Sequence, residues 1–389
     1  MTALDGVRIL DLSRLLPGPF CTLLLADLGA DVIKIEDTTS GDYLRWMPPL
    51  VDEYSAMFHA LNRNKRSVAL DLTHPAGRDA FLRLVSTADV VLESFRPGVM
   101  DRLELGYEAL RTINPRIIMC SVTGYGQDGP FRERAGHDLN YAARAGVLSI
   151  GGRTDGVPAM PALQVGDIGA GALHAAVAIL AALHERSRSG EGQHCDIAML
   201  DGLIAWMAPH AAVYFATGEV AGPATLTLNG RYPCYRMYRC ADGAVSVGAL
   251  EPKFWRELVT TLGLPHLADS AFADGAEGQR VADELQSTLA QRTRSELAAQ
   301  LGDEDVCCEP VLQLDEVFDQ AQVQHRGMWL APGAAGPVAQ VGFPIRLSRS
   351  ERRVRRQPPG WGADTRNVLG DAGYDDAALD ALAAEGAVR

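Results

Sequence analysis

Short apolar runs alternate with helical stretches over the first half of the chain. The runs are rich in Val, Ile and Leu and occupy residues 7–13, 31–37, 67–73, 89–95 and 116–124. Helical periodicity lies between them, as at residues 75–88, and a long helix is expected at 170–190, ending at Gly190. Continuous apolar strands alternating with helices are typical of a sheet buried on both faces. The pattern predicts an α/β fold with a parallel, doubly wound sheet.

The second half of the chain changes character. Residues 199–228 are rich in Ala and aromatic side chains, which predicts a packed helical linker. Two short strands (233–240 and 244–250) and helices at 253–263 and 284–302 then predict a smaller α+β unit. The expected division is a large domain at 1–198 completed by 335–365, linkers at 199–228 and 319–334, a small domain at 229–318, and a C-terminal helix at 366–389.

Composition narrows the class of protein. The chain has 389 residues and a net charge of −13, which argues against nucleic acid and anionic membranes as partners. Its seven cysteines form no CxxC pair, which favours a reduced, cytoplasmic protein. Charged residues and prolines interrupt the apolar N-terminus, so neither a signal peptide nor a membrane-spanning helix is expected.

One glycine motif invites a dinucleotide-binding interpretation. "GYGQDGP" at 124–130 matches G-x-G-x-x-G and follows a predicted strand. The motif requires a helix to open at its last glycine, whereas Pro130 and the charged run "FRER" follow here. We therefore expect no dinucleotide cofactor, and no metal-ligand spacing is apparent.

Two basic segments are candidates for phosphate binding. "LNRNKRSVALDL" (61–72) places Arg63, Lys65 and Arg66 before a strand, and Arg96 follows another strand. A solvated loop is the alternative for the first segment. Arg96 is expected at a strand end, where ligands of such sheets bind.

Two segments hold candidate acid–base residues at helix starts: His137 could take a proton, and Asp167 could act on a carbonyl compound. "RAGHDLNY" holds His137 beside Asp138 ahead of a predicted helix, and a helix cap is the simpler explanation for this pair. "GDIGAG" places Asp167 at another helix start, where its glycines would let a ligand approach the backbone. Amides near Asp167 and Gly169 are expected to hold an oxyanion.

These stretches together resemble the family III CoA transferases (the CaiB/BaiF superfamily), and within them the α-methylacyl-CoA racemases. The matching pieces run in order through nearly the whole chain. They are "LSRLLPGPFCTLLLADLGADVIKIE", "NRNKRSVALDL", "FRPGVMDRLELG", "NPRIIMCSVTGYGQDGP", "GDIGAG", "SGEGQHCDIAMLDG", "ADGAVSVGALEPKFW" and "EPVL".

The resemblance implies a Rossmann-like large domain, a smaller domain, and two interlocked chains that share their active sites. It implies His137 and Asp167 as the two proton-transfer bases of a racemase, with Glu251 paired to the histidine. It also implies an acyl-CoA substrate and no separate cofactor. The implied CoA or substrate contacts are Arg63, Lys65, Arg66, Ala69, Leu70, Asp71, Leu72, Arg96, Gly136, Asp138, Leu139, Asn140 and Tyr141.

The expected reaction interconverts (R)- and (S)-2-methylacyl-CoA through an enolate-like intermediate. The alternative is a CoA transferase, in which Asp167 forms an acyl anhydride and CoA passes to another carboxylate. A non-catalytic CoA-binding protein is a third reading, which the presence of all three candidate catalytic residues disfavours. The chain departs from the racemase pattern at residues 228–235 and at Asp37, where racemases carry a basic residue.

Overall fold

The computed structural model describes residues 2–152, 157–302 and 304–389, which form two compact units. The first unit comprises residues 1–145, 162–206 and 321–389, and the second comprises 146–161 and 207–320. The expected linker at 199–228 is therefore divided. Its first helix, α9 (Met199–Trp206), belongs to the first unit because it packs on residues 165–173 there.

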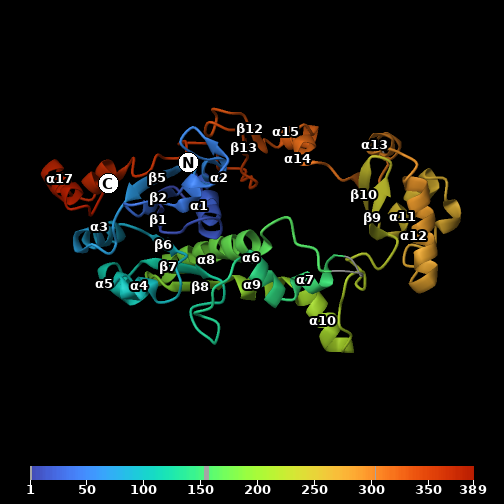
Figure 1. Cartoon of the computed structure of the whole chain (residues 1–389), viewed down its shortest axis with the longest axis horizontal. Helices are drawn as coiled ribbons and strands as arrows, with labels where there is room; N and C mark the ends of the chain where they lie inside the picture. Colours follow the sequence, from blue (N-terminus) through green and yellow to red (C-terminus); the bar gives the residue numbers. More distant parts are fainter. Residues whose placement is uncertain (1, 153–156, 303) are drawn as a thin grey trace. The chain divides into compact units, whose positions relative to one another are not determined.

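The first unit contains a six-stranded sheet in the order β5-β2-β1-β6-β7-β8, with every pair parallel (Figure 1). The strands are β1 (Arg8–Asp11), β2 (Asp31–Glu36), β5 (Lys65–Ala69), β6 (Val90–Glu93), β7 (Ile118–Thr123) and β8 (His194–Ala198). This order reverses direction between β1 and β6, as in doubly wound folds. The predicted fold class is confirmed. The edge strand β8 was not predicted, because its side chains alternate between exposed and partly buried positions.

Alternate side chains of the strands enter two separate cores. Ile9 and Val32 pack with one set of helices, and Leu10 and Ile33 pack with another on the opposite face. The first set is α1 (Pro17–Asp27) and α8 (His174–Ser189). The second set is α3 (Pro75–Val85), α5 (Tyr107–Ile113), α16 (Thr365–Asp371) and α17 (Asp376–Ala384).

Shorter elements complete the first unit. They are η1 (Tyr43–Trp46), β3 (Leu50–Val51), β4 (Tyr54–Ser55), α2 (Ala56–Leu61), α4 (Val99–Arg102), α6 (Asp138–Arg144), η2 (Val165–Leu173), α15 (Ala321–His325), β12 (Trp329–Leu330) and β13 (Gln340–Val341). Residues 335–365 add no strand to the main sheet. They are held on it by contacts such as that of the Arg355 guanidinium with the Ala26 and Ala30 carbonyls. The predicted single helix at 366–389 is wrong, because Gly373 separates α16 from α17 with a φ of 92°.

The second unit is built on an antiparallel sheet in the order β11-β10-β9. Trp255 and Leu285 are fully buried in its core. The predicted helix at 284–302 is interrupted, because Thr293 caps a new helix by accepting the Glu296 N–H. The elements are α7 (Val147–Ile150), α10 (Ala208–Thr217), β9 (Tyr235–Cys240), β10 (Gly243–Gly248), α11 (Pro252–Thr261), η3 (Pro265–Leu267), α12 (Gly275–Leu289), α13 (Arg294–Leu301), β11 (Cys308–Pro310) and α14 (Leu314–Val317).

Within the described residues, one helical stretch, Val165–Ser189, is long and apolar enough to cross a membrane by length and composition. Half of its most apolar window is buried inside the protein. The stretch packs against β7, β8 and α1, so its apolar residues also serve the core of the first unit.

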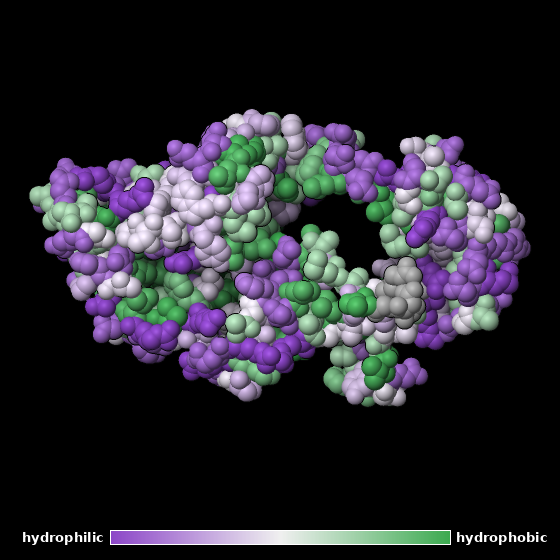
Figure 2. Space-filling model, viewed as in Figure 1, coloured by the Kyte–Doolittle hydropathy of each residue, from purple (hydrophilic) through white to green (hydrophobic). Residues whose placement is uncertain are grey.

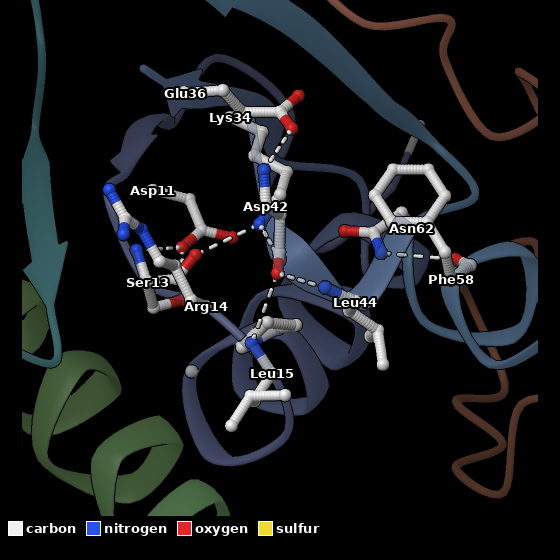
Figure 3. A network of polar contacts seen from close by, with 12 residues as sticks. Asp11, Ser13, Arg14, Leu15, Lys34, Glu36, Asp42, Leu44, Phe58 and Asn62 are labelled. Carbon is white, nitrogen blue, oxygen red and sulfur yellow. Dashed lines mark hydrogen bonds and ion pairs between the residues drawn. The ribbon is translucent and has the colours of Figure 1, made fainter. Parts of the chain in front are cut away.

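A network of buried charges lies between β1, β2 and β5 (Figure 3). The side chains of Lys34 and Lys65 are both 0% exposed. Burial acts to raise the pKa of Asp11, but the Lys65 and Lys34 ammonium groups outweigh it and hold that pKa below its ordinary value. The ion pairs are Lys34–Asp42 at 2.8 Å, Arg45–Glu36 at 2.7 Å and Lys65–Asp11 at 3.3 Å.

We expect Asp11→Ala to lower the free energy of unfolding by about 3–5 kcal/mol, because it leaves a buried ammonium without its carboxylate. Asp380→Ala is the matched control, since it removes a partner of Arg366 from an ion pair whose side chains are 55% and 71% exposed. Its cost should stay below about 1 kcal/mol. Urea denaturation followed by circular dichroism measures both. Equal losses in the two variants would contradict a special role for the buried network.

Candidate functional site

A cavity of about 680 Å³ lies in the first unit at the carboxyl ends of the central strands. Arg14 and Leu15 reach it from the loop after β1, and Phe95 and Arg96 reach it from the loop after β6. These loops flank the point where the strand order reverses. Ligands of doubly wound sheets bind at this position.

His137 and Asp167 both line this cavity. His137 directly precedes α6, where its side chain is exposed, and Asp167 lies in the first turn of η2, where it is half-buried. The backbone N–H of His137 donates to the Asn140 side chain at 3.0 Å. His137 therefore occupies the cap position of α6 and also borders the cavity, so the two readings of this histidine are compatible.

Asp138 connects the two candidate catalytic residues. Its Oδ1 accepts the backbone N–H of Gly166 at 2.6 Å and that of Asp167 at 2.9 Å. The side chain thus joins the start of α6 to the start of η2.

The Asp167 carboxyl is electrostatically unusual. Burial and, to a smaller extent, the Asp138 carboxylate raise its pKa to about 6 against the opposing effect of His137. A carboxyl with this pKa can both take and give a proton near neutral pH.

Arginines dominate the charged lining of the cavity. Arg14, Arg96, Arg132 and Arg134 all border it. Arg14 lies 3.3 Å from the Asp37 carboxylate, so a guanidinium is present beside the position where racemases carry a basic residue. Such a lining suits an anionic ligand. Among these arginines, the sequence had pointed to Arg96 alone; the others lie in loops directly after strands or before His137.

The predicted phosphate contacts of the "NRNKR" segment need correction. Arg63 is 3% exposed and binds the Asp27 carboxylate, and Lys65 is 1% exposed beside Asp11. Arg66 is largely buried and pairs with Asp31 at 2.6 Å. Their charges are neutralised inside the protein, so these side chains form no exposed basic rim.

The segment that follows is also covered. Ala69 and Leu70 are buried, and the Ala69 N–H donates to the Thr365 hydroxyl. The Asp71 N–H donates to the Ala387 carbonyl, while Leu72 packs on the core. The C-terminal segment, through Thr365 of α16 and Ala387 after α17, therefore covers the predicted CoA contacts at 69–72, and these residues do not line the cavity around His137.

The glycines of "GDIGAG" serve packing rather than ligand approach. A Cβ on Gly169 would lie 1.8 Å from the Trp206 ring, and one on Gly166 would lie 2.9 Å from the Asp138 Oδ1. The Asp167 N–H already donates to Asp138. The Asp167 N–H is therefore already used inside the first unit and does not hold an oxyanion, whereas an oxyanion contact of the Gly169 amide stays a prediction.

The other residues around His137 differ in their access to the cavity. Gly136, Asn140 and Tyr141 line it, and Leu139 is exposed. The Tyr141 hydroxyl donates to the Gly136 carbonyl, and its ring lies where a Cβ on Gly124 would come within 2.3 Å. The first glycine of "GYGQDGP" thus makes room for Tyr141, and a turn follows instead of a helix.

Glu251 lies in the second unit. It precedes α11 and its side chain is exposed. Its pairing with His137 stays a prediction.

A second cavity of about 430 Å³ shares Arg96 and Arg132 with the first. It contains Glu93, whose pKa burial raises to about 7, and a Ser121–His194 hydrogen bond of 2.9 Å. In the described part of the chain, no group of three or more His, Cys, Asp or Glu residues is placed to hold a metal ion.

Comparison with known proteins assigns nearly the whole length of the chain to one family. The family model for CoA-transferase family III matches residues 4–365. Succinyl-CoA:glutarate CoA-transferase of Mus musculus is 34% identical over 100% of this chain and 91% of its own. Alpha-methylacyl-CoA racemase of Homo sapiens is 34% identical over 96% of this chain and 94% of its own.

A solved structure agrees with these matches. A CAIB/BAIF family protein from Brucella suis superposes with a TM-score of 0.84 at 34% identity, covering 95% of this chain and 99% of that one. The match spans both units of the chain. With its doubly wound sheet and its cavity at the strand ends, the chain belongs to the family III CoA transferases.

Proposed function

We propose that the protein is a racemase or epimerase that interconverts (R)- and (S)-2-methylacyl-CoA thioesters. The observation that carries the proposal is that His137 and Asp167 line the same cavity. Inversion at one carbon needs a proton acceptor on one face and a proton donor on the other. A histidine and a half-buried aspartate provide two such groups.

The thioester carbonyl acidifies the α-proton, so either base can remove it. Loss of the proton moves the C–H electron pair into an enolate. The residue on the opposite face then delivers its proton to the α-carbon, which restores the thioester with inverted configuration. The two residues exchange protonation states in each turnover, and water resets them.

The charge of the cavity supports an acyl-CoA substrate. CoA carries a diphosphate and a 3′-phosphate, and arginine binds phosphate oxygens through paired N–H donors. Arg14, Arg96, Arg132 and Arg134 provide these donors around the cavity. No cofactor other than the CoA of the substrate is proposed.

A CoA transferase is the second candidate, and the identity to the murine succinyl-CoA:glutarate CoA-transferase favours it. In that reaction the Asp167 carboxylate attacks the thioester carbonyl, forms a mixed anhydride and releases CoA as thiolate. The thiolate then attacks the Asp167 carbonyl of the anhydride, which releases the first acid and leaves an Asp167–CoA thioester. The second carboxylate attacks this thioester to form a new anhydride, and the released thiolate takes the new acyl group and frees Asp167. This mechanism requires Asp167 but no second base.

Exchange of the α-proton with solvent separates these functions. Incubation of one enantiomer of a 2-methylacyl-CoA in D₂O should introduce deuterium at the α-carbon without any acceptor acid. His137→Gln should slow this exchange by roughly 10²–10⁴-fold, because it removes a positioned general base. Mass spectrometry of the recovered thioester measures the exchange.

His184→Gln is the matched control, since His184 lies on α8 outside the cavity. Its exchange rate should equal that of the unsubstituted protein. A protein that exchanges no deuterium, yet transfers CoA between acids with His137→Gln still active, would show that the racemase proposal is wrong. Hydroxylamine trapping of an Asp167 anhydride would then support the transferase.

Neutralising a cavity arginine should change the affinity for the substrate. Arg96→Gln should raise KM for the acyl-CoA more than it lowers kcat, and should weaken the dependence of KM on salt. Arg66→Gln is the control, because Arg66 pairs with Asp31 away from the cavity. If Arg66→Gln raises KM as much as Arg96→Gln does, the cavity arginines are not the CoA contacts.

A homodimer with shared active sites is part of the proposal, as is a cytoplasmic location. Apolar side chains are exposed on both units: Val177 and Ile204 in the first, and Phe215, which is 80% exposed, in the second. Figure 2 shows hydrophobic surface over α10, where Phe215 lies. Exposed apolar area of this kind commonly marks an interface.

We therefore expect sedimentation equilibrium to give a dimer at micromolar concentration. Phe215→Ser should weaken association, because it removes an exposed aromatic side chain from that surface. A fully active monomer at all concentrations would exclude shared active sites.

A further inference from the structure

The Asp138 carboxylate is placed between two segments that are distant in sequence. Its Oδ1 accepts the N–H groups of Gly166 and Asp167, which lie 28 and 29 residues further along the chain. Asp138 also directly follows His137. The Asp138 side chain is therefore hydrogen-bonded to the segment that carries Asp167, and its backbone adjoins His137, which lines the same cavity as Asp167.

We propose that Asp138 is a positioning residue, which sets the separation of His137 and Asp167 and whose charge opposes a second negative charge on Asp167. The proposal rests on the two-base function described above. It assigns to Asp138 a role that differs from substrate contact.

The local backbone explains why this side chain is effective. The first N–H groups of a helix have no partner within the helix, and Asp138 satisfies two of them at the start of η2. Gly166 allows this approach, since a Cβ there would lie 2.9 Å from the Asp138 Oδ1. On the other side, the Asn140 side chain accepts the His137 N–H. Both candidate bases are thus held by α6.

The charges around Asp167 come from several elements. From α6 and the residue before it, Asp138 and His137 act on the carboxyl in opposite directions. Burial is the main cause of the raised pKa of Tyr43 on η1 and of Tyr141 on α6, and the charge of Asp167 adds to both shifts.

The elements packed behind η2 offer fewer charges to this carboxyl. His174 of α8 is bonded to the Ala170 carbonyl, Asp196 of β8 accepts the Gln127 N–H, and Asp201 of α9 is exposed. Arg14 and Arg96 border the same cavity from the strand-end loops. Asp138 is therefore the carboxylate whose removal most directly changes the field at Asp167.

The charge of Asp138 is expected to change the pH dependence of kcat/KM. Racemisation requires that His137 and Asp167 together hold one proton, so kcat/KM falls in acid where both are protonated. The (R)-to-(S) and (S)-to-(R) reactions both start from this one-proton state. Their kcat/KM values therefore fall over the same acidic pH range, the acid limb of the profile. The pKa of Asp167 is about 6, because burial and the Asp138 charge both raise it. Loss of the Asp138 charge lowers this pKa and moves the acid limb to lower pH.

The decisive experiment compares two substitutions in the full-length protein. Asp138→Asn keeps an oxygen that accepts the two N–H groups but removes the charge. The acid limb of kcat/KM for α-deuterium exchange should then move down by on the order of one pH unit, with most of the activity at the optimum retained. Asp138→Ala also removes the acceptor, and kcat should fall by roughly 10²-fold because Asp167 is no longer held in place.

Asp201→Asn is the matched control, as it neutralises an exposed carboxylate on a helix that packs against η2. Its pH profile should equal that of the unsubstituted protein. If Asp138→Asn does not fold, Asp138→Ser supplies a neutral acceptor at the same position, with the same shift expected. An unshifted acid limb in a folded neutral variant, or unchanged kcat in Asp138→Ala, would overturn the proposal.

Failure of the proposed function gives a different result. If the unsubstituted protein exchanges no α-deuterium, the racemase proposal fails by itself. The same variants are then assayed for CoA transfer, which requires an ionised Asp167. A shifted acid limb in that assay would still support the role of Asp138, and an unshifted limb would reject it.

Discussion

The buried ammonium group of Lys34 needs a partner of opposite charge. The residues that supply its partners also hold the loops that border the cavity. The ammonium group binds the Asp42 carboxylate at 2.8 Å and the Ser13 carbonyl at 2.9 Å. Asp42 in turn accepts the Leu15 N–H (Figure 3). Residues 13–15 and 42–43 both border the cavity, the first segment through Arg14 and the second through Tyr43. An unpaired buried charge costs several kcal/mol, so the contacts of Lys34 are needed for a stable core. Because the same contacts hold the two cavity loops, stability and cavity geometry depend on one set of interactions.

The sequence predicts the strands of the fold better than it predicts which charged side chains are buried in ion pairs. Apolar runs identified the buried strands, since their burial on both faces leaves no alternation. The sequence does not show that Lys65 meets Asp11, 54 residues earlier, or that Arg63 meets Asp27. From sequence alone, a basic segment before a strand looks the same whether it is exposed at the surface or buried in ion pairs. Its depth depends on carboxylates that the fold brings from distant parts of the chain.

The site was predictable to the extent that each residue acts through its own side chain. The catalytic roles of His137 and Asp167 come from the resemblance of their motifs to a family, since a helix cap also explains His137, and they stay predictions. The structure adds that both residues line one cavity. The roles of amides and glycines could not be predicted, because they depend on what packs against them. Gly169 receives the Trp206 ring, and the amide of Asp167 binds Asp138. A glycine-rich helix start therefore predicts that another group lies close to its backbone. That group can be a side chain of the same protein instead of a ligand.

A carboxyl like that of Asp167 suits two chemistries that make different demands. A nucleophile must be ionised, whereas a proton carrier must exchange its proton near the working pH. With a pKa of about 6, Asp167 is mostly ionised at neutral pH and is still protonated often enough to act as an acid. The carboxyl alone therefore does not select between transferase and racemase. The residue beside it in the cavity must make that selection. Under the racemase proposal this residue is His137, which lines the same cavity as Asp167.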